Sequence, residues 1–332
     1  MATFNLFEEA ILVRRVVRQG GITAKSGKQS RDVADRLEAD RESFSTVVLK
    51  MTSKARAKIV QAINESQAIM DQNTLGWDTR AWNMCPAVRL AHVQREMDRI
   101  KNNFDDAVSE MLGNYDELRK DYLKRVTAKV AQEVPFPTYE QMQSNFSFDF
   151  LKMPLTNPND FRLKHMSAEA VSELRTEMNE QINIRLADTQ IEIVTRLIER
   201  VKKLHEQTAD KDSRLFKSLV TNIEEDCDVL PKLNLTNDPE INRLIARVRA
   251  ELSSIDVDTL KKDVKERALT HKLAGSVLDD LRSYNKNLKN AAPAPLAVTA
   301  PVKVVPTAEP VIVAPVKVKG VEFDFGSYAA KK

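Results

Sequence analysis

The sequence predicts a mostly α protein: an elongated antiparallel bundle of long helices, a small β element near the N-terminus and a disordered C-terminal tail. Charged residues make up 30% of the 332 residues and aromatics 6%, with only 8 glycines, a composition typical of long solvated helices. Two stretches, 86–132 and 167–207, repeat apolar residues every three or four positions. Six prolines between residues 293 and 315 then end the helical pattern.

The chain divides into four parts at changes of composition. Residues 1–75 are expected to form a small α/β segment, and residues 76–290 the long-helix bundle. Residues 291–320 are a linker rich in Pro, Ala and Val, which cannot bury enough apolar surface to offset its ordering entropy. Residues 321–332 form a short aromatic peptide after this linker.

Two runs near the N-terminus are rich in β-branched residues. They are "AILVRRVVR" at 10–18, followed by Gly20 and Gly21, and "FSTVVLKM" at 44–51. We expect the two runs to pair as a small sheet, with the polar stretch between them as an excursion. A short apolar run also fits a helix, so the helical alternative stays open here.

The first long helix is expected at 86–132, after a shorter helix at 52–73 and a loop that contains both tryptophans. Pro86 suits the first helical position because a first-turn residue needs no N–H donor. Gly113 lies inside the stretch, where it marks either a kink or a close contact.

The second long helix is expected to begin after Ser167, which suits an N-cap, and to reach about residue 207. A segment with four prolines separates it from the first, and in it Phe146, Phe148 and Phe150 alternate with polar residues, as in a strand with one buried face. The simplest way to bury both apolar stripes is an antiparallel pair of the two long helices, closed by this elbow.

Three further helices are expected before the linker. Asp212 or Ser213 caps the first, which Pro231 stops. Asp238 caps the second, with Pro239 in its first turn, and the last spans 259–288.

Three stretches carry a resemblance to known proteins. They are "REMDRIKNNFDDAVSEMLGNYDEL", "EVPFPTYEQMQSNFSFDF", and "SRLFKSLVTNIEEDCDVLPKLNLTNDPEINRLIARVRAEL" with "VDTLKKDVKERA" after it, within residues 80–285. In them the chain resembles a family of helical proteins without assigned activity in tailed-phage and some bacterial genomes. Members are often encoded near a MoxR-like AAA+ ATPase and a von Willebrand factor A protein. The resemblance implies no catalytic residues, and makes a phage-encoded AAA+ ATPase a candidate partner.

The residues that could carry chemistry are scattered. No glycine-rich phosphate loop is present, which argues against an ATPase. The histidines have no second ligand at metal-binding spacing, so we expect no metal and no cofactor; they are His92, His165, His205 and His271. The acids of "EEDCD" at 224–228 spread around a helix, so a solvated face is favoured over a cation site.

Cys85 precedes Pro86 at an expected helix start, where a thiol pKa can be lowered. No histidine stands near it in the sequence, so we favour a buried thiol packed against Trp77 and Trp82 over a reactive one. The loop "WDTRAW" is itself either an aromatic plug of the bundle, which we favour, or a binding loop.

The best local basic cluster lies near the N-terminus, in a chain whose net charge is only +3. It consists of Arg14, Arg15, Arg18, Lys25 and Lys28. On a strand Arg14 and Arg18 share a face that Arg15 does not, and acidic residues follow closely, so the cluster is split and diluted. It nevertheless provides the possible nucleic-acid contact, because binding to phosphates needs clustered cations.

The C-terminal peptide contains the residues that we expect to bind a partner: Phe323, Asp324, Phe325 and Tyr328. In an extended peptide the two phenylalanines fall on one side and Glu322 and Asp324 on the other, which suits addition to a partner's sheet edge or two adjacent pockets. Large aromatics are depleted from disordered segments that bind nothing.

The leading hypothesis is a non-enzymatic helical scaffold or adaptor that recruits a protein, such as an AAA+ ATPase, through its C-terminal peptide. The alternative is a DNA- or RNA-binding protein of phage replication or recombination; a virion component and a homo-oligomer stay open. Two isolated cysteines and no apolar run of about 20 residues predict a soluble cytoplasmic protein without a membrane span, in the host cytoplasm if phage-encoded.

Overall fold

The computed structural model describes residues 6–20, 23–43, 45–78, 82–158, 166–209 and 213–291, all within one compact unit that spans residues 1–298. The expected linker from residue 292 onward and the aromatic peptide at 321–332 lie outside the described residues, as do His165 and Asp212.

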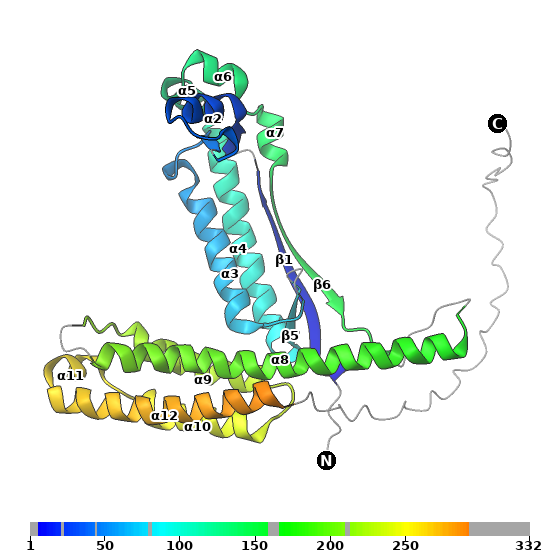
Figure 1. Ribbon diagram of the computed structural model, residues 1–332, viewed down its shortest axis with the longest axis vertical. Coiled ribbons are helices and arrows are strands. Elements are labelled where there is room, and N and C mark those ends of the chain that lie inside the picture. Colours follow the sequence, from blue (N-terminus) through cyan, green and yellow to red (C-terminus); the bar gives the residue numbers. More distant parts are fainter. Residues whose placement is uncertain are drawn as a thin grey trace, which may run out of the picture. The chain divides into compact units, whose positions relative to one another are not determined.

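The elements of the first half of the chain are strands and helices of mixed length (Figure 1). The strands are β1 (Ala10–Gln19), β2 (Thr23–Ser26), β3 (Thr46–Leu49), β4 (Leu75–Gly76), β5 (Asn83–Pro86) and β6 (Phe146–Pro154). The helices are α1 (Leu6–Glu9), α2 (Gly27–Arg36), α3 (Ala57–Asn73), α4 (Ala87–Gly113), α5 (Tyr115–Arg125), α6 (Ala128–Glu133) and α7 (Tyr139–Ser144), with short 3-10 turns at Arg41–Ser43 and Lys54–Arg56.

The second half is entirely helical in its described residues. Its helices are α8 (Ala168–Ala209), α9 (Ser218–Leu233), α10 (Pro239–Leu252), α11 (Val257–Lys262) and α12 (Val264–Asn290). The mostly α class and the small antiparallel sheet that starts near the N-terminus are thus confirmed.

The strand at 10–18 is confirmed as β1, but its expected partner is wrong. The main sheet has the order β4-β5-β1-β6, whereas the 46–49 segment pairs with β2 in a separate two-stranded sheet. Periodicity identifies a strand without choosing its partner. The ten residues of β1 need a long neighbour, and β6 provides it with an antiparallel register from Ile11↔Pro154 to Gln19↔Phe146.

One face of the β1–β6 ribbon packs on α3 and α4. Val13 and Phe148 are fully buried there, and the rings of Phe148 and Phe104 of α4 lie 5.7 Å apart. The alternation predicted for Phe146, Phe148 and Phe150 is therefore confirmed, with Phe150 only partly buried.

The single helix expected at 86–132 is wrong, because the chain leaves helical geometry twice. α4 ends at Gly113, where no atom lies within 4 Å of an added Cβ, so the glycine marks a helix end and no close contact. Val126 is extended, and Thr127 caps α6. The buried Tyr122 hydroxyl donates to the Val134 carbonyl at 2.5 Å, which ties this last segment back onto α5.

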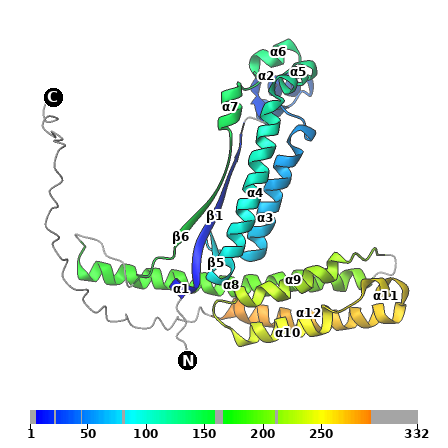
Figure 2. The same ribbon diagram turned by 180° about the vertical axis from the view of Figure 1, so that it is seen from behind.

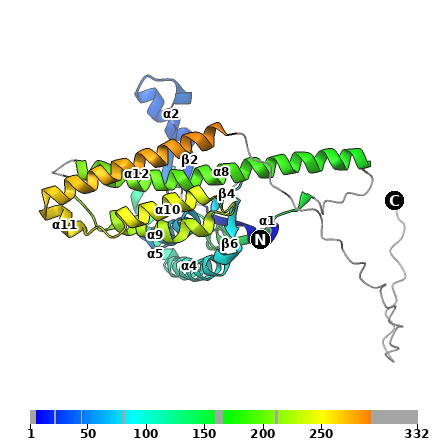
Figure 3. The ribbon, with the colours of Figure 1, turned by 90° about the horizontal axis from the view of Figure 1, so that it is seen from below.

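The two helices that were expected to pair, α4 and α8, do not pack against each other as a pair. α4 packs along α3, and α8 packs along α12, as Figure 3 shows for α8 and α12. Both pairs are antiparallel, because Lys58 contacts Glu110 and Asn285 contacts Thr195. Each of the two helices buries its stripe against a helix of its own half of the chain, and the Phe-rich strand pairs with β1 instead of closing an elbow.

The remaining helix starts were predicted with mixed success. Ser167 accepts a hydrogen bond from the Ala170 N–H at 3.2 Å, and the Asp238 carboxylate accepts from the Glu240 and Ile241 N–H groups, so both caps are confirmed. Pro231 does not stop α9, which starts later than expected and ends at Leu233, two residues after the proline.

Arg15 joins the ribbon to α3. Its guanidinium donates to the Ile63 carbonyl at 3.1 Å, to Ser66 Oγ at 2.8 Å and to Gln67 Oε1 at 2.6 Å. We expect Arg15→Ala to lower the free energy of unfolding by about 1.5–3 kcal/mol, since hydrogen bonds of a charged donor are lost from a half-buried site. Urea denaturation followed by circular dichroism measures this loss.

The matched control is Arg18→Ala, which removes an exposed arginine of the same strand. Its free energy of unfolding should change by less than about 0.5 kcal/mol. Equal losses in the two variants would contradict the anchoring role of Arg15.

Candidate interaction site: the open edge of β6

Among the described residues, β6 is an edge strand of nine residues that pairs only with β1. Figures 1 and 2 show no described helix or strand alongside it on the side away from β1, where the first half of α8 only passes below the end of the strand. The backbone N–H and C=O groups along this side form a row without strand partners, which is a template for another extended chain. We call this row the open edge.

The side of the ribbon turned away from α3 and α4 is called the outer face. Its residues follow from the register, which pairs Leu12 with Met153, Arg14 with Leu151, Val16 with Asp149 and Arg18 with Ser147. Leu151 is 44% exposed and Met153 43% exposed. Two large apolar side chains therefore stand uncovered beside the open edge.

Two lysines lie where the open edge meets α4. Lys101 Nζ donates to the Phe148 carbonyl at 3.1 Å and contacts Asp105. Lys152 Nζ donates to Gln94 Oε1 at 2.6 Å and lies 6.0 Å from the centre of the Phe150 ring, with no carboxylate paired to it among the described residues. The cations make the edge unattractive to neutral strands and favourable to acidic ones.

A hollow of about 320 Å³ adjoins the Met153 end of the open edge. Its walls come from β1, the tryptophan loop, the end of β6 and the first half of α8; they include Leu12, Trp77, Met153, Leu155, Met178 and Ile182. Asp78, Gln181 and Arg185 supply polar groups at its rim. A mostly apolar hollow of this size suits one large side chain of a bound peptide.

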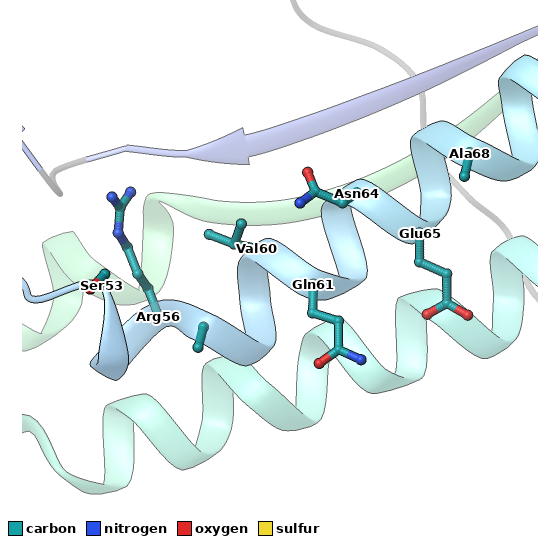
Figure 4. Close-up of a pocket in the computed structure, with 8 residues that line it drawn as sticks. Ser53, Arg56, Val60, Gln61, Asn64, Glu65 and Ala68 are labelled. Carbon is teal, nitrogen blue, oxygen red and sulfur yellow. The ribbon is translucent and has the colours of Figure 1, made fainter. Parts of the chain in front are cut away.

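A larger hollow of about 730 Å³ has a different character (Figure 4). All its lining residues, from Ser53 to Ala68, come from α3 and the turn before it. It is the outer surface of one helix, without the walls from several elements that define a ligand pocket. We therefore do not assign it as a site.

The structure separates the five predicted basic residues. Arg14 and Arg18 share the outer face, whereas Arg15 points to α3. Lys25 lies on β2, and Lys28 lies in α2, where its backbone N–H donates to the Glu133 carboxylate at 3.1 Å. The predicted partner-binding residues Phe323, Asp324, Phe325 and Tyr328 lie outside the described residues.

Cys85 is buried as predicted, but its neighbours are not the expected ones. It packs in the cluster of α3, α4 and the ribbon, whereas Trp77 and Trp82 pack, half-buried, against the other cluster. Burial raises the pKa of Cys85 to about 12, the opposite of an activated thiol. Cys227 is also buried, and burial raises its pKa to about 11.

The "EEDCD" segment is not the uniformly solvated face that was expected. Asp226 is buried and accepts from Arg200 Nε at 2.7 Å, which ties α9 to α8. Asp228 pairs with Arg249 of α10 at 2.6 Å. The described residues contain no group of three or more side chains placed to hold a metal ion.

The pairing of His205 and His271 was not predicted from the sequence. Their rings stack with centres 3.9 Å apart, and Nδ1 of each lies 3.0 Å from the backbone carbonyl of the other. This reciprocal contact fixes the register of α8 against α12. The two residues stand 66 positions apart, so only knowledge of the helix pairing would have revealed it.

Comparison with known proteins gives one match. Residues 48–203 match the family model described as "Protein of unknown function (DUF3150)". No curated protein and no solved structure matches the chain. The matched range includes α3, α4, β6 and most of α8, and so contains the open edge.

None of the described helices has the length and apolar character to span a membrane.

The two buried thiols predict a loss of stability at high pH. An unfolded thiol releases its proton above its ordinary pKa of 9.0, whereas the folded thiols keep theirs to about 11 and 12. The unfolded state then binds fewer protons, so the free energy of unfolding falls as pH rises from 9 toward 11. We expect this fall to be shallower in a Cys85→Ala/Cys227→Ala variant.

Urea denaturation at pH 8, 9, 10 and 10.5 measures both slopes, and the lysines and tyrosines titrate alike in the two proteins. Equal slopes, or rapid alkylation of either thiol in the native protein at pH 8, would contradict the burial of the thiols.

Proposed function

We propose that this protein is a non-enzymatic helical scaffold or adaptor that binds other proteins through an extended-strand contact at the open edge of β6. The observation that carries the proposal is the nine-residue open edge with exposed Leu151 and Met153 beside an apolar hollow. In this mode the backbone hydrogen bonds supply affinity, and pockets for alternate side chains supply specificity.

The ribbon is held rigidly, which favours such binding. Arg15 fixes it to α3, Lys101 and Lys152 connect β6 to α4, and Phe148 is buried in the core. A strand that is ordered before binding loses little conformational entropy when a partner docks. Most of the conformational entropy lost on association is therefore that of the incoming peptide.

The C-terminal peptide is the second part of the proposed adaptor. Phe323, Asp324, Phe325 and Tyr328 would recruit a partner at the end of a long spacer, as the alternation of aromatic and acidic residues suggests. A AAA+ ATPase, phage-encoded in the family that the sequence resembles, is the candidate partner, and that choice rests on the resemblance alone.

The nucleic-acid alternative rests on Arg14 and Arg18, which share the outer face. Arg15 is not available for a phosphate contact, because it is hydrogen-bonded to α3. Asp149, on the neighbouring strand between the two arginines, reduces the positive charge of the outer face. Since each phosphate contact needs its own cation, the remaining pair supports only weak binding.

A mobility-shift titration with single- and double-stranded DNA and with RNA at two salt concentrations tests this alternative. We expect no salt-dependent shift at micromolar protein. A shift that Arg14→Ala/Arg18→Ala abolishes would favour nucleic-acid binding over the adaptor proposal.

For the adaptor proposal, we expect Leu151→Lys/Met153→Lys in the full chain to lose a specific co-purifying protein, because two charges replace the apolar contacts beside the open edge. Affinity purification with quantitative mass spectrometry compares this variant with the wild type and with a chain that lacks residues 321–332. Thermal unfolding should change little in all of them.

Leu123→Lys is the matched control, because Leu123 is 50% exposed and lies in helix α5, outside the sheet that contains β6. It should retain the co-purifying protein. Hydrogen exchange of the purified complex should then show slower exchange in 146–154. Retention of every partner by the double variant, with unchanged exchange in β6, would refute this role of the edge.

A further inference from the structure

The shape and charge of the open edge fit a particular segment of the sequence. We propose that the open edge of β6 binds residues 321–328 of a second copy of this chain, so that the protein assembles with itself. This inference rests on the proposed function and deepens it by naming the partner of the same site.

The segment "VEFDFGSY" has the alternation that an edge strand requires. In an extended chain Val321, Phe323 and Phe325 lie on one side, and Glu322 and Asp324 lie on the other. The open edge has a matching alternation, with Leu151 and Met153 on the outer face and Lys152 between them on the opposite face.

Two contacts at once favour one register of this pairing. If the two phenylalanines stand opposite Leu151 and Met153, Asp324 stands opposite Lys152, and this holds for both directions of the added strand. Cross-strand apolar pairs and opposite charges each stabilise a sheet. Slipping the segment by one residue would place Asp324 against an exposed apolar side chain and leave Lys152 facing a phenylalanine.

The hollow beside Met153 strengthens the fit. It adjoins the position where one of the two phenylalanines would stand, and its walls are mainly the apolar side chains of Trp77, Leu155, Met178 and Ile182. A buried aromatic anchor at one end of an edge-strand contact is a common source of affinity.

The length of the linker favours a second copy as the source of the peptide. Residues 292–320, at about 3.1 Å per residue for a Pro-rich chain, reach up to about 90 Å. The longest helix of the described structure, α8 with 42 residues, measures about 63 Å. A spacer of this reach is longer than that helix, so its peptide can reach a neighbouring molecule.

A contact between one copy's peptide and another copy's edge is heterologous, so it can close as a reciprocal exchange between two copies or continue as a longer chain of copies. The expected product is therefore self-association that increases with protein concentration. Its subunits are connected by linkers, so the assembly needs no other rigid interface.

The first test uses a fluorescent synthetic peptide of residues 319–330 and the full chain carrying Phe323→Ala/Phe325→Ala, which removes competition from its own peptide. We expect saturable binding that weakens at least tenfold when Lys152→Glu is added. A peptide with Asp324→Lys should bind the Lys152→Glu protein at least tenfold better than the unchanged peptide does.

Lys120→Glu is the matched control, because it makes the same charge change at an exposed lysine of α5. It should leave peptide binding within about twofold. Peptide affinity that is unchanged by Lys152→Glu would overturn the assignment of the edge. So would a failure of the Asp324→Lys peptide to restore binding to the Lys152→Glu protein.

The second test is sedimentation velocity of the unmodified full chain over a hundredfold range of concentration. We expect the mean mass to rise with concentration, and the Phe323→Ala/Phe325→Ala chain to keep the mass of one copy. A mass of one copy at all concentrations for the unmodified chain would overturn the second-copy proposal.

The two proposals fail in different ways. If the peptide does not bind but Leu151→Lys/Met153→Lys still loses a co-purifying protein, self-assembly is wrong and the adaptor proposal stands. If the peptide binds and the double variant retains every other partner, the edge serves self-assembly alone and the wider adaptor role is wrong.

Discussion

The structure depends on β1, which is buried on both faces near Leu12 and Val13. Leu12 and Val13 are adjacent in β1 and point to opposite faces, and each belongs to a different hydrophobic cluster. Met84 and Cys85 of the paired strand β5 divide between the two clusters in the same way. Two neighbouring strands are thus the place where the cluster of α3 and α4 meets the cluster of α8 to α12.

We call this meeting place of the two clusters at β1 and β5 the seam. It explains why a small sheet is indispensable to the fold. An amphipathic helix presents one apolar stripe, and no described helix contributes buried residues to both clusters. A strand presents two faces by its geometry, and β1 and β5 use both. Further links across the seam are polar: the Gly76 N–H donates to Glu192 at 3.0 Å, and Arg196 donates to the Thr74 carbonyl at 2.6 Å.

The sequence predicts local features well and pairings poorly. The Asp238–Pro239 start, the Ser167 cap and the Phe146–Phe150 alternation are local signals with a fixed geometric meaning, and all three are confirmed. The partner of β1 and the partners of α4 and α8 depend on which apolar faces meet in space. No spacing rule contains that information, because several faces in this chain have similar width and composition.

The same limit applies to the candidate site. The strand of β6 was predicted, but its position at the edge of the sheet became apparent only with the register, and with it the exposure of Leu151 and Met153. Arg15 shows the reverse case: the sequence groups it with Arg14 and Arg18, whereas the alternation of the strand turns it to α3. A cluster in sequence is a cluster in space only when its members share a face.

In the proposed contact, the lysines beside β6 would serve two purposes that follow from one physical fact. An unpaired edge invites any extended chain, and charged side chains along it raise the free energy of pairing with neutral or basic strands. The same charges lower the free energy of pairing with a strand that places a carboxylate opposite Lys152. Specificity is the difference between the affinities for two partners. Lys152 lowers the affinity for neutral or basic strands and raises the affinity for an acidic one. The same residue would therefore both protect the edge against aggregation and select an acidic partner.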